Sequence, residues 1–221
     1  MKSVTRYPAV DLPASLREIL QSVSLFASPD FLAVWQTRNG KGVYWCVEND
    51  GTLTILPGVE FGTGMFVRFQ SLSDGLYSQP ISLQGSTIVT MPESHITALL
   101  AAIANHAYMK TWVYDYYHSF QNITGFTATA CETHVIDITS PTWEPPDATL
   151  RSEIRKAERE NIQIERFALS RHFDSFLVLM KSTEQRHGRK PKYSTDFFRA
   201  LAKLAEKDPR IIWKQCTYEG K

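Results

Sequence analysis

Cysteines, long apolar runs and an apolar leader are scarce or absent in this chain of 221 residues. The three cysteines, Cys46, Cys131 and Cys216, lie far apart without a CxxC pair, and an odd number cannot close a complete disulfide framework. No stretch approaches the roughly 18–20 apolar residues that cross a bilayer, and the N-terminus lacks the apolar segment of a signal peptide. These absences predict a cytoplasmic protein that does not span a membrane.

Motifs that define a reaction class are also missing. The chain has no GxxxxGK[ST] phosphate loop, no GxGxxG after a strand and no GxSxG nucleophile elbow. Its six histidines do not share the spacing of metal ligands, so no metal site is expected. No nucleophile, base and orienting residue form a recognisable set, so the catalytic residues stay unknown at this stage.

The composition is that of a packed α/β protein, with 43% hydrophobic and 12% aromatic residues. A helix is expected at residues 28–39, where Ser28 can cap the helix and Pro29 can occupy its first position. Hairpin strands are expected on either side of the Asp50-Gly51 turn signal. The remaining elements expected in the first half are strands at 65–70, 111–117 and 127–138 and a helix at 92–106. Residues 1–140 therefore predict an α/β domain with a mixed sheet.

A proline-rich segment at residues 141–147 is the predicted linker, and Asp147 or Thr149 can cap the helix that follows it. Two strands and three helices are expected beyond this linker, and so small a sheet leaves its edges unpaired. Residues 148–221 are therefore interpreted as the start of an incomplete domain. Either a continuation of the chain completes this sheet, or its last strand is swapped or pairs with another molecule. The expected elements are helices at 148–161, 171–187 and 195–207 and strands at 163–167 and 210–217.

The two parts of the chain carry opposite charge, although the net charge of the whole chain is only +1. Residues 151–221 contain 17 Lys and Arg against 10 Asp and Glu, whereas residues 1–150 contain 7 against 13. This asymmetry predicts that the second part binds an anionic ligand. The surface of the second part that faces the first part is one candidate location for this site.

The helix at 148–161 concentrates part of this positive charge. Leu150 and Ile154 have the spacing of an apolar stripe that is expected to face inward, while Arg151, Arg155 and the neighbouring Lys156 lie on other faces. The cations predict an anion-binding ridge. A solvated face that is interspersed with glutamates is the alternative interpretation.

A second basic cluster occupies the loop after residue 185. Arg186, His187, Lys190 and Tyr193 lie in or next to a turn that contains Gly188, and cations of this kind suit phosphate oxygens. His187 is the histidine best suited to acid–base or phosphate contacts. A mobile surface loop is the alternative.

The loop after the strand at 65–70 is a further candidate site, since long loops after strands are common places for function. Asp74 and Tyr77 are the residues in it that could hydrogen-bond a ligand across the domain interface. An Asp-Gly turn beside a packed tyrosine explains them equally well.

Several segments carry a family resemblance. In the second half, residues 150–164 read Leu-Arg-Ser-Glu-Ile-Arg-Lys-Ala-Glu-Arg-Glu-Asn-Ile-Gln-Ile, and Thr-Glu-Gln-Arg-His-Gly-Arg-Lys-Pro-Lys-Tyr-Ser follows at 183–194. In the first half, Ser-Pro-Asp-Phe-Leu starts at 28, Ile-Leu-Pro-Gly at 55 and Phe-Gln-Ser-Leu-Ser-Asp-Gly-Leu-Tyr at 69. Together these segments resemble the FemAB-like branch of the GNAT acyltransferase superfamily, in which an R-x-x-I-R-K-A helix opens the second of two tandem acyltransferase-like domains.

The resemblance implies a GNAT-like N-terminal domain followed by an incomplete second GNAT-like domain. It also implies transfer of an acyl group from a thioester or tRNA ester to an amine of a cell-wall or polysaccharide precursor. Acyl-CoA or aminoacyl-tRNA would be the donor, and no cofactor would be bound permanently. The residues that match the family's cationic helix and basic loop are Arg151, Arg155, Lys156, Arg186, His187, Lys190 and Tyr193. The alternative is a non-catalytic module that binds a nucleotide-sugar or coenzyme through a degenerate acyltransferase fold, and RNA binding ranks third.

Overall fold

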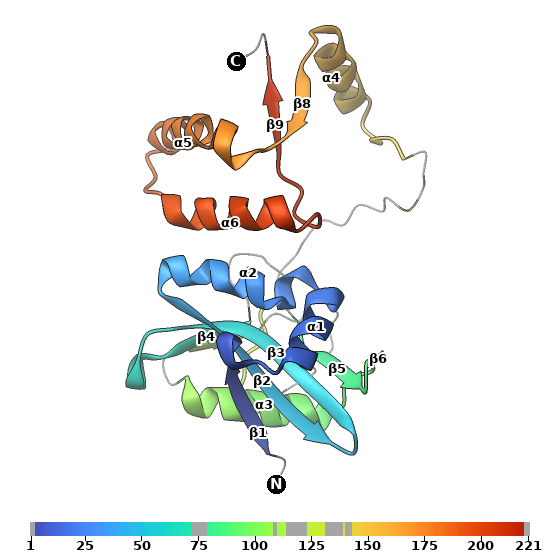
Figure 1. Ribbon diagram of the computed structural model, residues 1–221, viewed down its shortest axis with the longest axis vertical. Coiled ribbons are helices and arrows are strands. Elements are labelled where there is room, and N and C mark those ends of the chain that lie inside the picture. Colours follow the sequence, from blue (N-terminus) through green and yellow to red (C-terminus); the bar gives the residue numbers. More distant parts are fainter. Residues whose placement is uncertain are drawn as a thin grey trace.

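The computed structural model describes residues 3–71, 79–107, 110–113, 123–130, 139 and 143–218. These residues form a mixed α/β structure with one mixed sheet, a separate pair of strands, and helices (Figure 1). The predicted α/β class with a mixed sheet is confirmed. We call residues 3–113 the first unit and residues 148–218 the second unit.

A seven-stranded sheet organises the first unit, with the main strand order β1-β2-β3-β4-β7. Neighbouring strands are antiparallel except β4 and β7, which are parallel, and the chain between them contains α3 (Glu93–His106). The short strands β5 and β6 extend the sheet from another part of the β3 edge. The strand bounds are β1 Val4–Pro8, β2 Gly40–Asn49, β3 Thr52–Phe61, β4 Arg68–Gln70, β5 Ile81–Gln84, β6 Thr87–Val89 and β7 Lys110–Trp112.

The β2–β3 hairpin forms around the predicted turn. Asp50 and Gly51 both have positive φ angles, 51° and 73°, which is the conformation that two-residue hairpin turns require. Pro57 lies in the middle of β3, although a proline cannot donate a ladder hydrogen bond. Along that edge, β5 pairs with residues up to Ile55 and β4 with residues from Val59 onward. Pro57 therefore falls between the registers of two successive neighbouring strands.

Both faces of the first sheet are covered by helices. One face packs with α1 and α2 in a core that includes Tyr44 and Cys46. The other face packs under α3 in a second core that includes Val43 and Trp45. Because alternate residues of β2 enter two different cores, its middle, Val43–Val47, is apolar without interruption. The helices on the first face are α1 Ala14–Val23 and α2 Pro29–Val34, and the 3-10 turn η3, Trp35–Arg38, follows α2.

The second unit is smaller, and its strands β8 (Gln163–Arg166) and β9 (Lys214–Thr217) pair antiparallel. A small core around Phe167 and Phe173 lies between this strand pair and the helices α5 and α6. Phe167 stacks on Trp213 with ring centroids 4.4 Å apart. The helices of this unit are α4 Ala148–Arg159, α5 Leu169–Arg186 and α6 Thr195–Lys207.

The order of elements in the second unit repeats the order that opens the first. In the first unit, β1 is followed by α1, α2 and β2, and β1 pairs antiparallel with β2. In the second unit, β8 is followed by α5, α6 and β9, and β8 pairs antiparallel with β9. This strand–helix–helix–strand repeat was not visible as residue identities in the sequence.

The two units meet where α6 packs against α2 and η3 (Figure 1). The rings of Trp35 and Phe197 contact edge to face across this junction, with centroids 5.3 Å apart. Phe197 and Leu204 of α6 belong to the same buried cluster as α1 and α2. The core on this face of the first sheet therefore extends across the predicted linker.

Several elements differ from their prediction. The strands β1, β5 and β6 and the helix α1 were not predicted from the sequence. Met65 and Phe66 lie in a 3-10 turn instead of a strand, and residues 127–130 of the predicted strand at 127–138 are not in a strand. Residues 114–117 and 131–138 of the predicted strands lie outside the described residues.

Candidate functional site

The basic helix α4 begins at the predicted cap. The Asp147 carboxylate accepts hydrogen bonds from the backbone N–H groups of Leu150 and Thr149, at 3.2 and 2.6 Å. These bonds hold the pKa of Asp147 below its ordinary value, because they favour the ionised carboxylate. Asp147 therefore defines where the linker ends and the helix starts.

The three predicted cations of α4 have different surroundings. Arg151 donates from Nη1 to the carbonyl oxygens of Pro145 and Pro146, at 2.6 and 2.8 Å, so it anchors the linker. Lys156 Nζ lies 3.8 Å from Glu160 Oε1 in an exposed pair one helical turn apart. Arg155 is exposed. Arg155 and Lys156 therefore remain available to a ligand in solution, whereas Arg151 has a structural role.

The apolar stripe of α4 does not face inward as predicted. Leu150 and Ile154 are 45% and 41% exposed, and no residue of α4 is buried. Figure 1 shows α4 apart from α5 and α6. The prediction was wrong because the described part of the chain offers no surface that packs against this stripe.

The predicted basic loop joins α5 to α6. Arg186 is the last residue of α5, His187 caps the helix, and Gly188 adopts the left-handed conformation common after a helix end. Lys190 is exposed. Tyr193 stacks on Phe197, with ring centroids 4.5 Å apart, so it packs at the junction between the units.

The structure does not bring the two basic clusters together. In Figure 1, α4 and the connection between α5 and α6 lie on opposite sides of the β8–β9 pair. One small ligand therefore cannot contact both clusters in this arrangement. Asp74 and Tyr77, the candidates in the loop after β4, lie outside the described residues.

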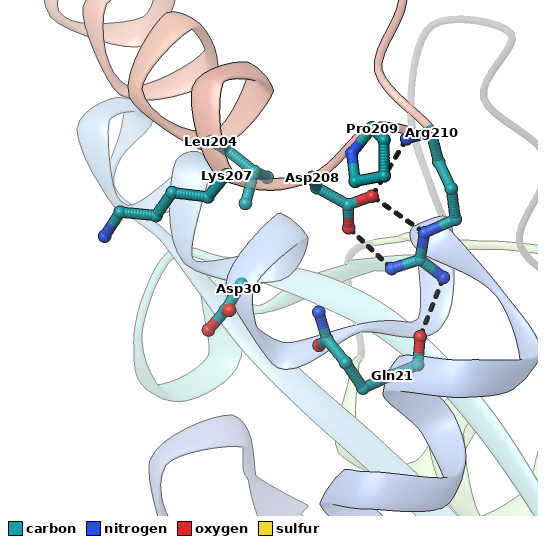
Figure 2. Close-up of a pocket in the computed structure, with 7 residues that line it drawn as sticks. All are labelled: Gln21, Asp30, Leu204, Lys207, Asp208, Pro209 and Arg210. Atoms are coloured by element: carbon teal, nitrogen blue, oxygen red, sulfur yellow. Dashed lines mark hydrogen bonds and ion pairs between the residues drawn. The ribbon is translucent and has the colours of Figure 1, made fainter.

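An open pocket of about 380 Å³ lies at the junction of the units (Figure 2). Its walls come from α1, from the first turn of α2, and from the end of α6 with the residues that follow. None of the predicted site residues lines it. The lining residues are Gln21, Asp30, Leu204, Lys207, Asp208, Pro209 and Arg210.

A salt bridge holds one wall of this pocket. Arg210 donates from Nε and Nη2 to the Asp208 carboxylate, at 2.9 and 2.6 Å, and from Nη1 to the backbone oxygen of Gln21 at 2.7 Å (Figure 2). The Arg210 hydrogen bonds lower the pKa of Asp208, and the carboxylate in turn raises the pKa of Arg210. Because Gln21 belongs to α1, Arg210 ties the second unit to the first.

A buried carboxylate lies on the α3 face of the first sheet. Glu60 of β3 is 4% exposed, and its oxygens accept hydrogen bonds from Arg6 Nε and Nη2 at 2.9 and 2.6 Å. This two-pronged contact raises the pKa of Arg6. His106 Nε2 lies 3.4 Å from Glu60 Oε1, an ion-pair distance without hydrogen-bond alignment. The result is a carboxylate–histidine pair at the end of α3.

Unsatisfied polar atoms occur in His106 and in two strands of the first sheet. Within the described part of the chain, Trp45 Nε1, His106 Nε2 and Thr111 Oγ1 are buried without a hydrogen-bond partner. The Trp45 ring packs edge to face against His106, with centroids 5.4 Å apart. Buried polar atoms normally find partners, so such a group is a candidate for function.

A second buried polar chain links β3, β5 and α3. Thr54 Oγ1 lies 2.7 Å from Ser82 Oγ and 2.8 Å from His95 Nδ1. All three residues are almost fully buried. Thr54 connects the serine to the histidine, so the three buried polar side chains satisfy one another in a hydrogen-bonded network within the core.

Sequence reasoning missed Glu60, His106 and the Asp208–Arg210 pair. A signal existed for Glu60, since it is an acidic residue in an otherwise apolar run of β3. Its partner Arg6 lies 54 positions earlier, in a strand that was not predicted. For Asp208 and Arg210, the Asp-Pro-Arg sequence after a helix was the available signal.

No family model matches this chain, and searches of curated proteins and of solved structures find no significant match. Every helix in the described ranges is too short or too polar to cross a lipid bilayer.

Proposed function

We propose that this chain belongs to an acyltransferase of the FemAB-like, GNAT-related kind, which transfers an acyl or aminoacyl group to an amine. The strand–helix–helix–strand repeat carries this proposal, because two tandem domains of similar fold are what the family resemblance implies. The mixed sheet of the first unit, in which β4 and β7 are parallel, is compatible with the fold that the resemblance implies. The remaining order is antiparallel.

The chemistry requires a neutral amine and a proton acceptor. The amine nitrogen attacks the carbonyl carbon, the bond to the thioester sulfur or ribose oxygen breaks, and the amine loses a proton. We assign proton acceptance to His106, with Glu60 beside its ring to stabilise the imidazolium that forms. The His106 side chain is 38% exposed whereas its Nε2 is buried, so we assign proton acceptance to Nδ1.

Cations are needed for the phosphates of either donor. Arg155 and Lys156 on α4 are exposed and suit contacts to coenzyme A phosphates or to tRNA. Replacing both with alanine is expected to weaken donor binding, with little change in the free energy of unfolding, because exposed helix cations contribute less than about 1 kcal/mol. A double variant with unchanged affinity for every donor would remove α4 from the binding site.

The test of the function is transfer of an acyl group to a lysine-containing peptide, followed by mass spectrometry. Acetyl-coenzyme A and bulk aminoacyl-tRNA are the two donor probes. His106→Gln is expected to lower the rate at least about 100-fold, which is the usual contribution of acid–base catalysis. Glu18→Gln, a change at an exposed site on α1, is the matched control and should keep the wild-type rate.

Non-catalytic binding of a phosphate-bearing ligand is the second candidate. The exposure of Arg155 and Lys190 favours it, because such cations bind phosphate without any catalytic group. Thermal stabilisation by coenzyme A or a UDP-sugar without acyl transfer would favour this candidate. If no probe, tRNA included, gives either acyl transfer or thermal stabilisation, both candidates are contradicted.

A further inference from the structure

The Glu60 carboxylate has two neighbours that approach the same oxygen. Glu60 Oε1 accepts a hydrogen bond from Arg6 Nε at 2.9 Å and lies 3.4 Å from His106 Nε2. Glu60 Oε2 accepts a hydrogen bond from Arg6 Nη2 at 2.6 Å. Because the guanidinium holds both oxygens, the carboxylate cannot turn without breaking a charge-assisted hydrogen bond. Arg6 therefore fixes the oxygen that lies beside the histidine ring.

Burial makes the carboxylate depend on a cationic partner. The Glu60 side chain is 5% exposed and the Arg6 side chain 30% exposed. A buried carboxylate without a cation is strongly unfavourable, so Glu60 without Arg6 would favour a proton on the neighbouring His106. The partner that Glu60 holds thus decides whether the ring is charged between reactions.

Few other charged groups lie in the strands that α3 packs against. In the described part of β1, β2, β3 and β7, Lys41 is exposed and lies opposite Glu60 in the register, on the same face of the sheet. Lys110 of β7 is exposed and places its Nζ 3.8 Å from the centroid of the Trp112 ring. Glu48 lies at the far end of β2. Arg6 is therefore the cation that directly holds the carboxylate.

We infer that Arg6 is a positioning residue for His106 and acts through Glu60. It fixes the carboxylate oxygen beside Nε2 and neutralises the carboxylate, so that the ring begins the reaction with Nδ1 free of a proton. The proton that the amine loses goes to Nδ1, and the ring passes it to the leaving sulfur or ribose oxygen. Glu60 stabilises the imidazolium in between. This inference rests on the proposed function.

Arg6→Met tests the role of the charge by NMR titration of the His106 ring, which needs no turnover. Without the guanidinium, the proton shared by Glu60 and His106 should be held more tightly, so the ring should titrate about one pH unit higher than in the wild type. Arg17→Met, which removes a partly buried arginine from α1 on the other face of the sheet, is the matched control and should leave the titration unchanged. An unshifted titration in Arg6→Met would overturn the inference.

Arg6→Lys separates position from charge, because lysine keeps the positive charge but cannot hold both oxygens. We expect kcat to fall about tenfold, as is usual when a group that orients a catalytic residue is lost, with KM nearly unchanged. The rise of the rate with pH should stay where it is in the wild type. A lysine variant with the wild-type kcat would contradict a positioning role.

A second pair of variants is used if Arg6→Met does not fold. Glu60→Gln alone and Glu60→Gln with Arg6→Met leave no buried carboxylate without a partner. Because Arg6 acts through Glu60, the two variants should have the same kcat, and a further loss in the double variant would overturn the inference. If the wild type transfers no acyl group, the proposed function fails. The NMR titration still decides whether Arg6 controls the protonation of His106.

Discussion

The two strand–helix–helix–strand motifs of this chain are completed to different degrees. In the first unit, β2 has a strand on each edge and a helical layer on each face. In the second unit, β9 has one paired strand, and Ile164 remains exposed on the outer face of the pair. The comparison shows that the motif alone buries one face of a strand pair. Further strands and a helix such as α3 are needed to bury the other.

The second unit gains part of its burial from the first. Its own buried cluster contains Phe167, Phe173 and Ala202, whereas Phe197 and Leu204 of α6 are buried in the cluster of α1 and α2. The stability of the second unit is therefore expected to depend on its contact with the first, while the first unit contributes most of one shared core and has the core under α3 to itself.

Phe197→Ala tests this dependence and should have the largest effect among changes at the junction. The ring is 7% exposed and packs against Trp35, so its loss leaves a cavity at the junction. We expect a loss of about 3 kcal/mol in the free energy of unfolding, measured by urea denaturation. Phe66→Ala, at a ring that is 64% exposed, is the control and should change stability little. Equal effects of the two changes would mean that the junction is not formed in solution.

A matched pair of substitutions in the two sheets sharpens the comparison. Leu56→Ala removes a fully buried side chain from β3 and should cost about 2–5 kcal/mol. Ile164→Ala removes an exposed side chain from β8 and should cost less than about 0.5 kcal/mol. If both variants lose similar stability in denaturant melts, the outer face of β8 is covered in solution.

Arg210→Ala should weaken the junction by a smaller amount. It removes the hydrogen bond to the α1 carbonyl of Gln21 and leaves the Asp208 carboxylate without its main partner. We expect a loss of about 1 kcal/mol, since 35% of the Arg210 side chain is exposed to solvent. Hydrogen exchange at the end of α1 should increase in this variant. Unchanged exchange there would exclude Arg210 as a tie between the units.

The contribution of the Asp208–Arg210 pair should fade in acid. The pKa of Asp208 is lowered from its ordinary 3.8 in the folded protein. The stabilisation by the pair is therefore fully present above pH 3.8. It is lost as the pH falls through the lowered value. The difference in unfolding free energy between wild type and Arg210→Ala should therefore be constant near neutral pH and shrink below about pH 4. A difference that grows in acid would contradict this assignment.

The parts of the fold that were predictable are those with local signals. The Asp50-Gly51 turn, the Ser28 cap and the Asp147 cap each act on residues a few positions away, and all three form as the sequence indicates. The strand β1 was missed because long-range pairing with β2 determines it, and β6 was missed because it has only three residues.

The candidate sites were less predictable, because they depend on distant partners. Glu60 became a candidate only when the structure placed Arg6 and His106 beside it. Periodicity showed that α4 has an apolar stripe, but it could not show whether any surface covers the stripe. Arg155 of α4 and Lys190 between α5 and α6 remain predicted ligand contacts, and Figure 1 shows α4 and the α5–α6 connection on opposite sides of the β8–β9 pair.

The position of Pro57 makes the first sheet modular. Since the proline falls between the registers of β5 and β4, the β5–β6 ribbon and the β4–β7 pair attach to β3 at separate places. Insertions or deletions at the tip of the ribbon, around Gly85, can therefore be accommodated without shifting the alignment of β4. The ribbon is thus a position where the chain can vary in length while the rest of the sheet is preserved.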